Sequence, residues 1–251
     1  MNIQIALSFP FKDSNWILKL LIGGALSFVS LFPMAFGVVG QENAFIRLLT
    51  YLLFLVLVGV FFAPLGYAFS ILKSALAGEE KPSLPEWKSW ETLFKDGLGV
   101  FIVGLAYGIL IALLSMLVGV LTAKVPVLGA VFSLLQLVIG ILILLVSPFI
   151  AIALCKVAQT GQVLSAFKFL EILNELKSKA SQYISASLIL LGVMQIIKIS
   201  LDLNLFEYMM SARAHLNSTV SFPLVGFLTP FVMFWILIVS FRMYGEIYGK
   251  K

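Results

Sequence analysis

Residues 46–76 read IRLLTYLLFLVLVGVFFAPLGYAFSILKSAL, an almost uninterrupted apolar run. About 20 mainly apolar residues are enough for a helix to cross the hydrocarbon core of a bilayer, and this run is longer. Pro64 lies inside it and predicts a kink, because proline has no backbone N–H to donate within a helix. Of the 251 residues, 61% are hydrophobic and 12% are charged, whereas soluble domains carry about a quarter charged residues. The composition therefore predicts an integral membrane protein.

Six runs of this kind predict an all-α, polytopic integral membrane protein with six transmembrane helices. The runs are Trp16 to Phe36, Ile46 to Leu76, Gly97 to Leu121, Val127 to Ala158, Gln182 to Ile199 and Phe222 to Tyr244. The fourth contains Pro148, which predicts a second kink. Polar joins pair the runs into three helical hairpins of a single membrane domain, with the hairpins at about 1–77, 83–160 and 163–251.

The distribution of positive charge predicts how the chain is oriented in the membrane. With six spans, the N-terminus, the joins after the second and fourth runs and the C-terminus lie on the same side of the membrane. The other side then holds only four of the 17 Lys and Arg residues, namely Arg47, Lys124, Lys198 and Arg213. Basic residues are enriched on the cytoplasmic side, so we expect both termini in the cytoplasm. The net charge of +5 is thus assigned to a face that suits anionic lipids and not to a nucleic-acid partner.

The join GEEKPSLPEWKSWETLFKDG, residues 78–97, is the longest strongly polar passage of the chain. Ser83 and Glu86 have the spacing of a capping box, which predicts the start of an amphipathic helix over Glu86–Asp96. A second amphipathic helix is predicted over Ala166–Lys179. Helices of this type lie in the headgroup plane, with their apolar side in the acyl boundary and their charges in water. Both are therefore expected to be cytoplasmic interfacial helices.

Residues at the membrane interface are expected to be aromatic or aliphatic: Phe11, Trp16, Trp87, Trp90, Phe94, Phe169 and Leu173. The charged face of the first helix, Glu86, Lys88, Glu91 and Lys95, is a candidate surface for a partner protein. A docking surface for another protein would have the same pattern as an interfacial helix. Phe-Lys precedes the first, third and fifth runs, which indicates either an internal threefold repeat or chance in a chain with 22 Phe residues.

The segments SFPFKDSNWILKLLIGG, residues 8–24, and GYAFSILKSALAGEEKPSLPEWKSWETLFKDGL, residues 66–98, resemble a bacterial and archaeal membrane family called domain of unknown function 4013. Lys88 and Ser89 stand where many relatives carry acidic residues. The resemblance implies a multi-helix protein of a prokaryotic cell membrane and brings no established activity. It is carried by Pro10, Phe11, Asp13, Trp16, Gly78, Glu79, Pro82, Leu84, Pro85, Glu86, Trp87, Asp96 and Gly97.

Few side chains offer chemistry. His215 is the one histidine and lies in an external join, and Cys155 is expected to be a small packed hydrophobe. The carboxylates of the 78–97 join alternate with lysines, which favours a solvated surface over a metal or acid–base site. No Asp, Glu, Lys or Arg lies near the centre of any run, where ion-coupled transporters place one. We therefore expect a non-enzyme without metal or cofactor.

Small and amide-bearing residues inside the runs predict how the helices pack. Gly104 and Gly108 form a GxxxG pair on the third run, and Gln136 and Gln195 are expected to hydrogen-bond across helices.

The leading hypothesis is an accessory or scaffold subunit that associates with lipid and with a partner membrane complex or another copy of itself. The alternative is a transporter or carrier of a lipid-like or otherwise hydrophobic small solute, along a path made by the kinks at Pro64 and Pro148. An enzyme acting on lipid headgroups ranks third.

Overall fold

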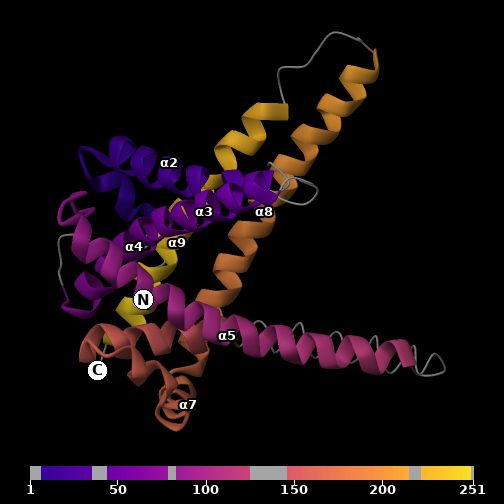
Figure 1. The fold of residues 1–251 in the computed structure, drawn as a ribbon. Helices are drawn as coiled ribbons and strands as arrows, with labels where there is room; N and C mark the ends of the chain where they lie inside the picture. Colours follow the sequence, from indigo (N-terminus) through magenta and orange to yellow (C-terminus); the bar gives the residue numbers. More distant parts are fainter. Residues whose placement is uncertain (1–6, 36–43, 79–82, 125–145, 215–221, 250–251) are drawn as a thin grey trace.

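The computed structural model describes residues 7–35, 44–78, 83–124, 146–214 and 222–249 (Figure 1). All regular secondary structure in these ranges is helical, which confirms the all-α prediction. In chain order the elements are η1 (Phe9–Lys12), α2 (Trp16–Ala35), α3 (Ala44–Val60), α4 (Phe62–Leu76), α5 (Trp90–Lys124), a helix at Val146–Thr160, η3 (Val163–Phe167), α7 (Phe169–Ser178), α8 (Ala180–Ala214) and α9 (Phe222–Gly249).

The length and composition of the helices agree with the prediction of a membrane protein. Four described segments are long and apolar enough to cross a bilayer: Arg47–Leu76, Trp90–Leu113, Ala180–Ile197 and Leu228–Gly249. Trp16–Val29 and Val146–Thr160 are shorter apolar helices. Much of the fourth predicted run, up to residue 145, lies outside the described residues. The described part of the chain thus supports four spanning helices, and six remains a prediction.

Pro64 interrupts the second run as predicted. α3 ends at Val60 and α4 begins at Phe62, so the apolar segment consists of two helices joined at Phe61. Pro64 has no N–H to donate to the carbonyl of Val60, and the helical ladder breaks where that bond would have been. Leu65 N–H resumes the ladder with the carbonyl of Phe61, at 3.4 Å. Pro148 lies near the first described residue of its helix, so its predicted kink falls at the edge of the described chain.

α4 lies at the centre of the packed body and contacts mainly α5 and α9. α9 in turn packs against α2 and α8. The α4 side chains Tyr67, Ile71 and Leu72 are each at most 1% exposed, as are Ile238 and Met243 of α9. The core is therefore formed by a short helix from the first predicted hairpin and a long one from the third.

The crossing of α4 and α5 depends on two glycines. A Cβ atom at Gly66 would overlap the carbonyl of Leu93, and one at Gly97 would overlap the carbonyl of Phe62. The backbones therefore meet directly, as at small-residue contacts between membrane helices. No described atom lies within 4 Å of a Cβ built at Gly104 or Gly108, so in the described chain the predicted GxxxG pair packs against nothing. Within the described chain, the close glycine contact of α5 is at Gly97, and the packing role of the pair stays a prediction.

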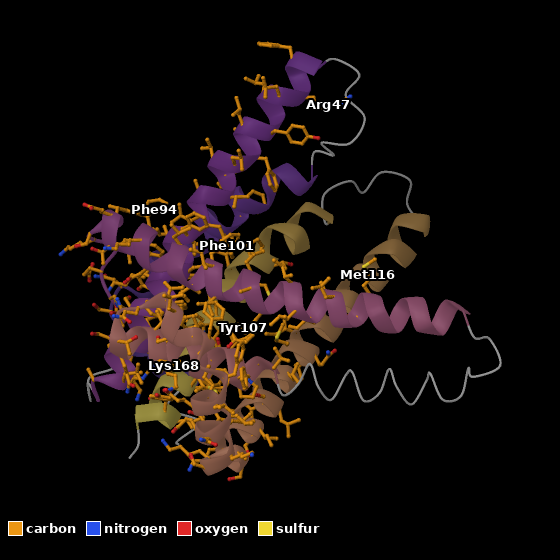
Figure 2. The ribbon with its side chains drawn as sticks, turned by 60° about the horizontal axis from the view of Figure 1, so that its bottom comes forward. Arg47, Phe94, Phe101, Tyr107, Met116 and Lys168 are labelled. Atoms are coloured by element: carbon orange, nitrogen blue, oxygen red, sulfur yellow. The ribbon has the colours of Figure 1, made fainter. Side chains whose placement is uncertain are left out.

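The outer part of α5 extends away from this body (Figures 1 and 2), and so does α3 (Figure 2). Arg47 marks the far end of α3 and Met116 lies on the outer part of α5 in Figure 2. On α5, Val103 and Tyr107 are buried, but the described side chains from Gly108 to Met116 are all exposed except the half-buried Ile111. The outer parts of both helices thus present apolar surface to their surroundings.

The amphipathic helix predicted from Ser83 is wrong at its start. Residues 83–89 are not helical, and α5 begins at Trp90 and continues into the membrane-spanning segment without a break. Ser89 has φ of 56°, a left-handed backbone conformation that residues other than glycine rarely adopt. Glu86 pairs with Lys19, at 2.8 Å, and therefore does not close a capping box with Ser83. The side chain of Glu86 thus binds a lysine far along the chain in place of the predicted partner, the backbone N–H of Ser83.

The second predicted amphipathic helix is present as the short helix α7. Its Ile172 is buried, while Phe169, Leu170 and Leu173 are exposed. Lys156 of the preceding helix pairs with Glu171 of α7. The hydrogen bond from Lys156 lowers the pKa of the Glu171 carboxyl, and desolvation opposes it without reversing the direction.

The two glycine environments on α5 give a matched pair of variants. Gly97→Ala is expected to lower the melting temperature of the detergent-solubilised protein, because the added methyl forces α4 and α5 apart at a cost of about 1–3 kcal/mol. Gly104→Ala, where the space is open, is expected to leave it unchanged or raise it, since alanine is the better helix former. Thermal unfolding followed by size-exclusion chromatography measures both. Equal effects of the two substitutions would contradict the glycine contact.

Candidate functional site

A buried ion cluster joins the N-terminal segment to the 83–89 loop. Its members are Asp13, Lys19, Leu84 and Glu86, and we call it the Lys19 cluster. Lys19 Nζ lies 2.9 Å from Asp13 Oδ2, 2.8 Å from Glu86 Oε1 and 2.8 Å from the carbonyl oxygen of Leu84. The side chains of Lys19 and Asp13 are only 6% and 7% exposed, and that of Glu86 is 57% exposed. An ammonium group has three protons to donate, and here each has an acceptor.

Asp13 accepts hydrogen bonds from both chain segments. Its Oδ1 receives the backbone N–H of Asn15 at 2.8 Å, and its Oδ2 receives the N–H of Leu84 at 3.1 Å besides the Lys19 ammonium. Burial by itself would raise the pKa of the Asp13 carboxyl, but the hydrogen bonds and the charge of Lys19 outweigh burial, and the pKa lies below its ordinary value of 3.8. The carboxylate is thus the form that the fold requires.

Aromatic side chains complete the attachment of the loop. Trp87 stacks on Tyr67 of α4, with ring centroids 4.2 Å apart, and its Nε1 donates to the carbonyl of Lys19 at 3.1 Å. Tyr67 donates its hydroxyl to the carbonyl of Pro85 at 2.8 Å. Every loop residue from Leu84 to Trp87 therefore has a partner on α2, on α4 or in the segment before α2.

The Lys19 cluster is a structural site. Its cation donates to three acceptors of the chain, and its buried carboxylate, Asp13, accepts from three donors of the chain, so both groups are engaged in holding the loop to the segment before α2. Among the described residues, no group of three or more His, Cys, Asp or Glu side chains could hold a metal. Cys155 is fully buried, in line with the packed hydrophobe that was expected, and His215 lies outside the described residues.

A second lysine fixes the end of α9. Lys179 Nζ donates to the carbonyls of Ile247 and Tyr248, at 3.3 and 3.1 Å, and pairs with Glu175 at 3.0 Å. A cation at a helix C-terminus satisfies carbonyls that have no partner within the helix. The residues just before α8 are thereby tied to the last turn of α9.

The predicted interface residues fall into two environments. Trp16 and Trp87 are half-buried and pack against the core. The others are exposed side chains on the outside of η1, α5 and α7: Phe11, Trp90, Phe94, Phe169 and Leu173. The structure places them on helix surfaces, and their depth in a membrane stays a prediction.

The candidate partner surface is divided in the same way. Glu86 is held by Lys19, whereas Lys88, Glu91 and Lys95 are exposed around the start of α5. Asp96, next to Lys95, pairs with Lys73 of α4 at 2.7 Å. The predicted packing residue Gln195 is exposed on α8, and Gln136 lies outside the described residues.

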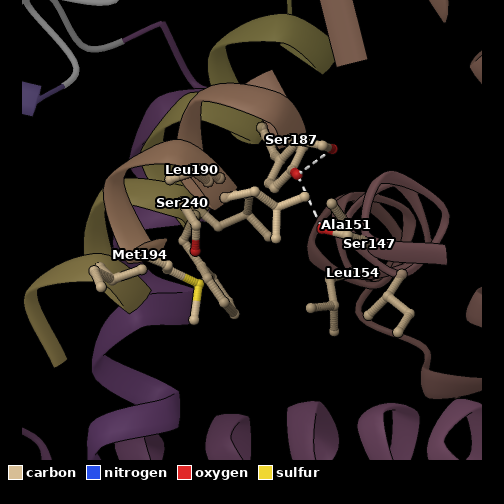
Figure 3. A pocket seen from close by; sticks show the side chains of 13 residues that line it. Ser147, Ala151, Leu154, Ser187, Leu190, Met194 and Ser240 are labelled. Carbon is tan, nitrogen blue, oxygen red and sulfur yellow. Dashed lines mark hydrogen bonds between the residues drawn. The ribbon is translucent and has the colours of Figure 1, made fainter. Parts of the chain in front are cut away.

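A cavity of about 490 Å³ lies between the 146–160 helix, α8 and α9. In Figure 3, Ser147, Ala151 and Leu154 face it from one side, and Ser187, Leu190, Met194 and Ser240 from the other. Its polar atoms include the hydroxyls of Ser147, Ser187 and Tyr244, which hydrogen-bond to one another. This group was not predictable from the sequence, because its members are 40 or more residues apart and no local pattern connects them.

Removal of one charge from the Lys19 cluster is expected to destabilise the protein strongly. Lys19→Met leaves the Asp13 carboxylate buried without its cation, and breaking a buried pair in this way costs about 3–5 kcal/mol. Lys95→Met, an exposed lysine at the start of α5, is the control and is expected to change the melting temperature little. The double variant Asp13→Asn/Lys19→Met should recover part of the loss. A Lys19→Met protein as stable as Lys95→Met would rule out this role.

The same cluster predicts a dependence of stability on pH. The folded-state pKa of Asp13 is lowered, so the stabilisation is fully present above the unfolded-state pKa of about 3.8 and is lost as the pH falls through the folded-state value. The difference in unfolding free energy between the wild type and Asp13→Asn should therefore be constant near neutral pH and shrink in acid below about pH 4. Unfolding in detergent at a series of pH values measures it. A difference that grows in acid would contradict the assignment.

The comparisons with known proteins give a family without an activity. The sequence model of a family described as "Protein of unknown function (DUF4013)" matches residues 49–206, which include the 83–89 loop and more than half of the chain. No curated protein and no solved structure matches the chain. The match confirms the resemblance carried by the 78–97 join, and the chain belongs to the DUF4013 family.

Proposed function

We propose that this protein is a non-enzymatic accessory or scaffold subunit of a membrane, which associates with lipid and with a partner membrane complex. The observation that carries the proposal is the apolar surface of α3 and the outer part of α5. Leu55 and Val56 of α3 are 64% and 65% exposed, and Met116 of α5 is 66% exposed. An exposed apolar surface of this extent indicates contact with a membrane or with another protein.

The placement in the membrane is part of the proposal. Six spanning helices in three hairpins, with both termini in the cytoplasm of a prokaryote, agree with the apolar runs and with the excess of Lys and Arg on one side. In this orientation the 83–89 loop, α7 and the end of α9 face the cytoplasm. Trp90, Phe94 and Phe169 then lie at the depth of the lipid headgroups, where aromatic side chains are favoured.

The charged start of α5 is the proposed contact for a soluble part of the partner. Lys88, Glu91 and Lys95 are exposed there, while the neighbouring Glu86 and Asp96 are paired with lysines of the chain itself. Charged groups at the rim of an interface give selectivity and speed of association more than affinity. A partner that buries apolar surface on α3 or α5 would complete the contact.

A carrier of a lipid-like or hydrophobic small solute is the second candidate. The observation that favours it is the 490 Å³ cavity, whose size and mainly apolar walls are typical of small-molecule sites. The break at Phe61 caused by Pro64 gives a carrier a place to bend.

Affinity purification from a prokaryotic host that carries the family, in mild detergent and followed by mass spectrometry of proteins and lipids, tests the proposal. The wild type is expected to bring down a defined membrane complex. Charge reversal at Lys88 and Lys95 is expected to reduce that recovery several-fold, because rim charges select the partner. Lys177→Glu, at an exposed position on α7, is the control and should leave recovery intact. Solute flux in liposomes that hold this chain alone, without any co-purifying complex, would favour the carrier instead.

Tryptophan fluorescence tests the interfacial placement. Trp90 is 44% exposed, and it is expected to be quenched by lipids that carry a bromine near the headgroup. Replacing Trp90 by Phe should remove that quenching with little loss of stability. Trp87→Phe should instead lower the melting temperature, because Trp87 Nε1 donates to the Lys19 carbonyl. If quenching were unchanged in Trp90→Phe, the interfacial position would be incorrect.

A further inference from the structure

The three hydroxyls in the cavity form a hydrogen-bond chain with a fixed direction. Ser187 Oγ lies 3.0 Å from the carbonyl oxygen of Tyr183, Tyr244 Oη lies 2.8 Å from Ser187 Oγ, and Ser147 Oγ lies 3.0 Å from Tyr244 Oη (Figure 3). A carbonyl only accepts, so the proton of Ser187 is committed to it. Tyr244 must then donate to Ser187, and Ser147 must donate to Tyr244. Each bond uses one of the three hydroxyl protons.

This direction of the hydrogen bonds leaves an acceptor, and no donor, at Ser147, the open end of the hydroxyl chain. Ser147 has given its only proton to Tyr244, so the unused lone pairs of Ser147 Oγ are what it offers to a ligand. Ser147 itself is exposed and lines the cavity. Ser240 also lines the cavity but donates to the carbonyl of Leu237 in its own helix, at 2.7 Å. The polar end of the cavity thus suits a group that donates a hydrogen bond.

The rest of the cavity suits an alkyl chain. From the hydroxyl chain it continues along α8 to Met194, which is about 10 Å of helix rise. The side chains along this path are apolar, among them Leu190, Leu191 and Ile236. α8 and α9 both contain segments long and apolar enough to cross a bilayer, so an amphiphile of the membrane is a ligand that suits both ends of this cavity. A molecule with a hydrogen-bond donor at its head and an alkyl chain as its tail matches both the polar end and the apolar walls of the cavity.

We propose that this cavity binds a single-chain amphiphile whose head donates a hydrogen bond, such as a long-chain alcohol or a monoacylglycerol. The head donates to Ser147 Oγ, and the alkyl chain lies along Leu190, Leu191 and Met194. The proposal goes beyond a scaffold function and holds for a scaffold and for a carrier, since it concerns binding and not transport.

The experiment uses the full chain in phosphatidylcholine nanodiscs, because the headgroup of that lipid has no hydrogen-bond donor and cannot compete. Hexadecanol with a photoreactive diazirine on its tail is compared with its methyl ether, which accepts but does not donate. The wild type is expected to bind the alcohol about 3- to 10-fold more tightly, the effect of one hydrogen bond. Cross-links should fall on α8, at or near Leu191 and Met194.

Three variants test the direction of the hydrogen bonds. Ser147→Ala should weaken binding of the alcohol towards the level of the ether, because the exposed acceptor is gone and the lone pair freed on Tyr244 Oη belongs to a buried residue, 3.0 Å from the former position of Ser147 Oγ. Tyr244→Phe should strengthen binding of the ether, since the proton of Ser147 is released and can be donated to the ether oxygen. Ser240→Ala is the matched control, a serine of the same cavity whose loss should leave the preference unchanged.

Equal binding of alcohol and ether to the wild type would overturn the proposal. So would a preference that persists in Ser147→Ala, a loss in Ser240→Ala as large as in Ser147→Ala, or cross-links confined to other helices. A monodisperse size-exclusion peak for each variant separates these outcomes from misfolding. Recovery of a partner complex in the purification described above does not depend on this site, so the two proposals fail independently.

Discussion

The ammonium group of Lys19 is the constraint on which the end of the fold where α2 and α5 begin depends. It lies among apolar helices where water does not satisfy it, and its three protons need three acceptors from the chain. Asp13 comes from the segment before α2, and Leu84 and Glu86 come from the loop before α5. One acceptor precedes the first predicted span in the sequence, and the other two follow the second span. The cluster therefore fixes where α2 and α5 begin relative to each other. Trp87 and Tyr67 then place α4 against the same loop.

The features that follow from local chemistry were predictable from the sequence. Length and apolar composition are enough to identify a spanning helix, and four described segments meet that criterion. The break before Pro64 follows from a missing N–H, which every proline brings. α7 has an apolar side and a charged side within ten residues, and it forms at the predicted position. Each of these conclusions needs only neighbours in the sequence.

The features that failed or were missed depend on partners far along the chain. Ser83 and Glu86 have the pattern of a helix cap, yet the carboxylate of Glu86 binds Lys19, which a local rule cannot include. Gly97 and Gly104 are both glycines of α5, and only the position of α4 decides that the first is a contact and the second is not. The hydroxyl chain joins Ser147, Ser187 and Tyr244 from three helices. The spacing of residues in the sequence does not predict these long-range contacts.

The Lys19 cluster and the hydroxyl chain differ in what they leave open to a ligand. In the Lys19 cluster, each of the three protons of the ammonium has an acceptor in the chain, so a ligand of Lys19 would have to displace a bond that is already made. In the hydroxyl chain, the protons run in one direction and end on a carbonyl, so an acceptor without a donor remains at Ser147. A ligand of the Lys19 ammonium would therefore compete with bonds that the chain already makes, whereas a hydrogen-bond donor at Ser147 would not. On this difference rests the proposal that the cavity, and not the Lys19 cluster, binds a small molecule.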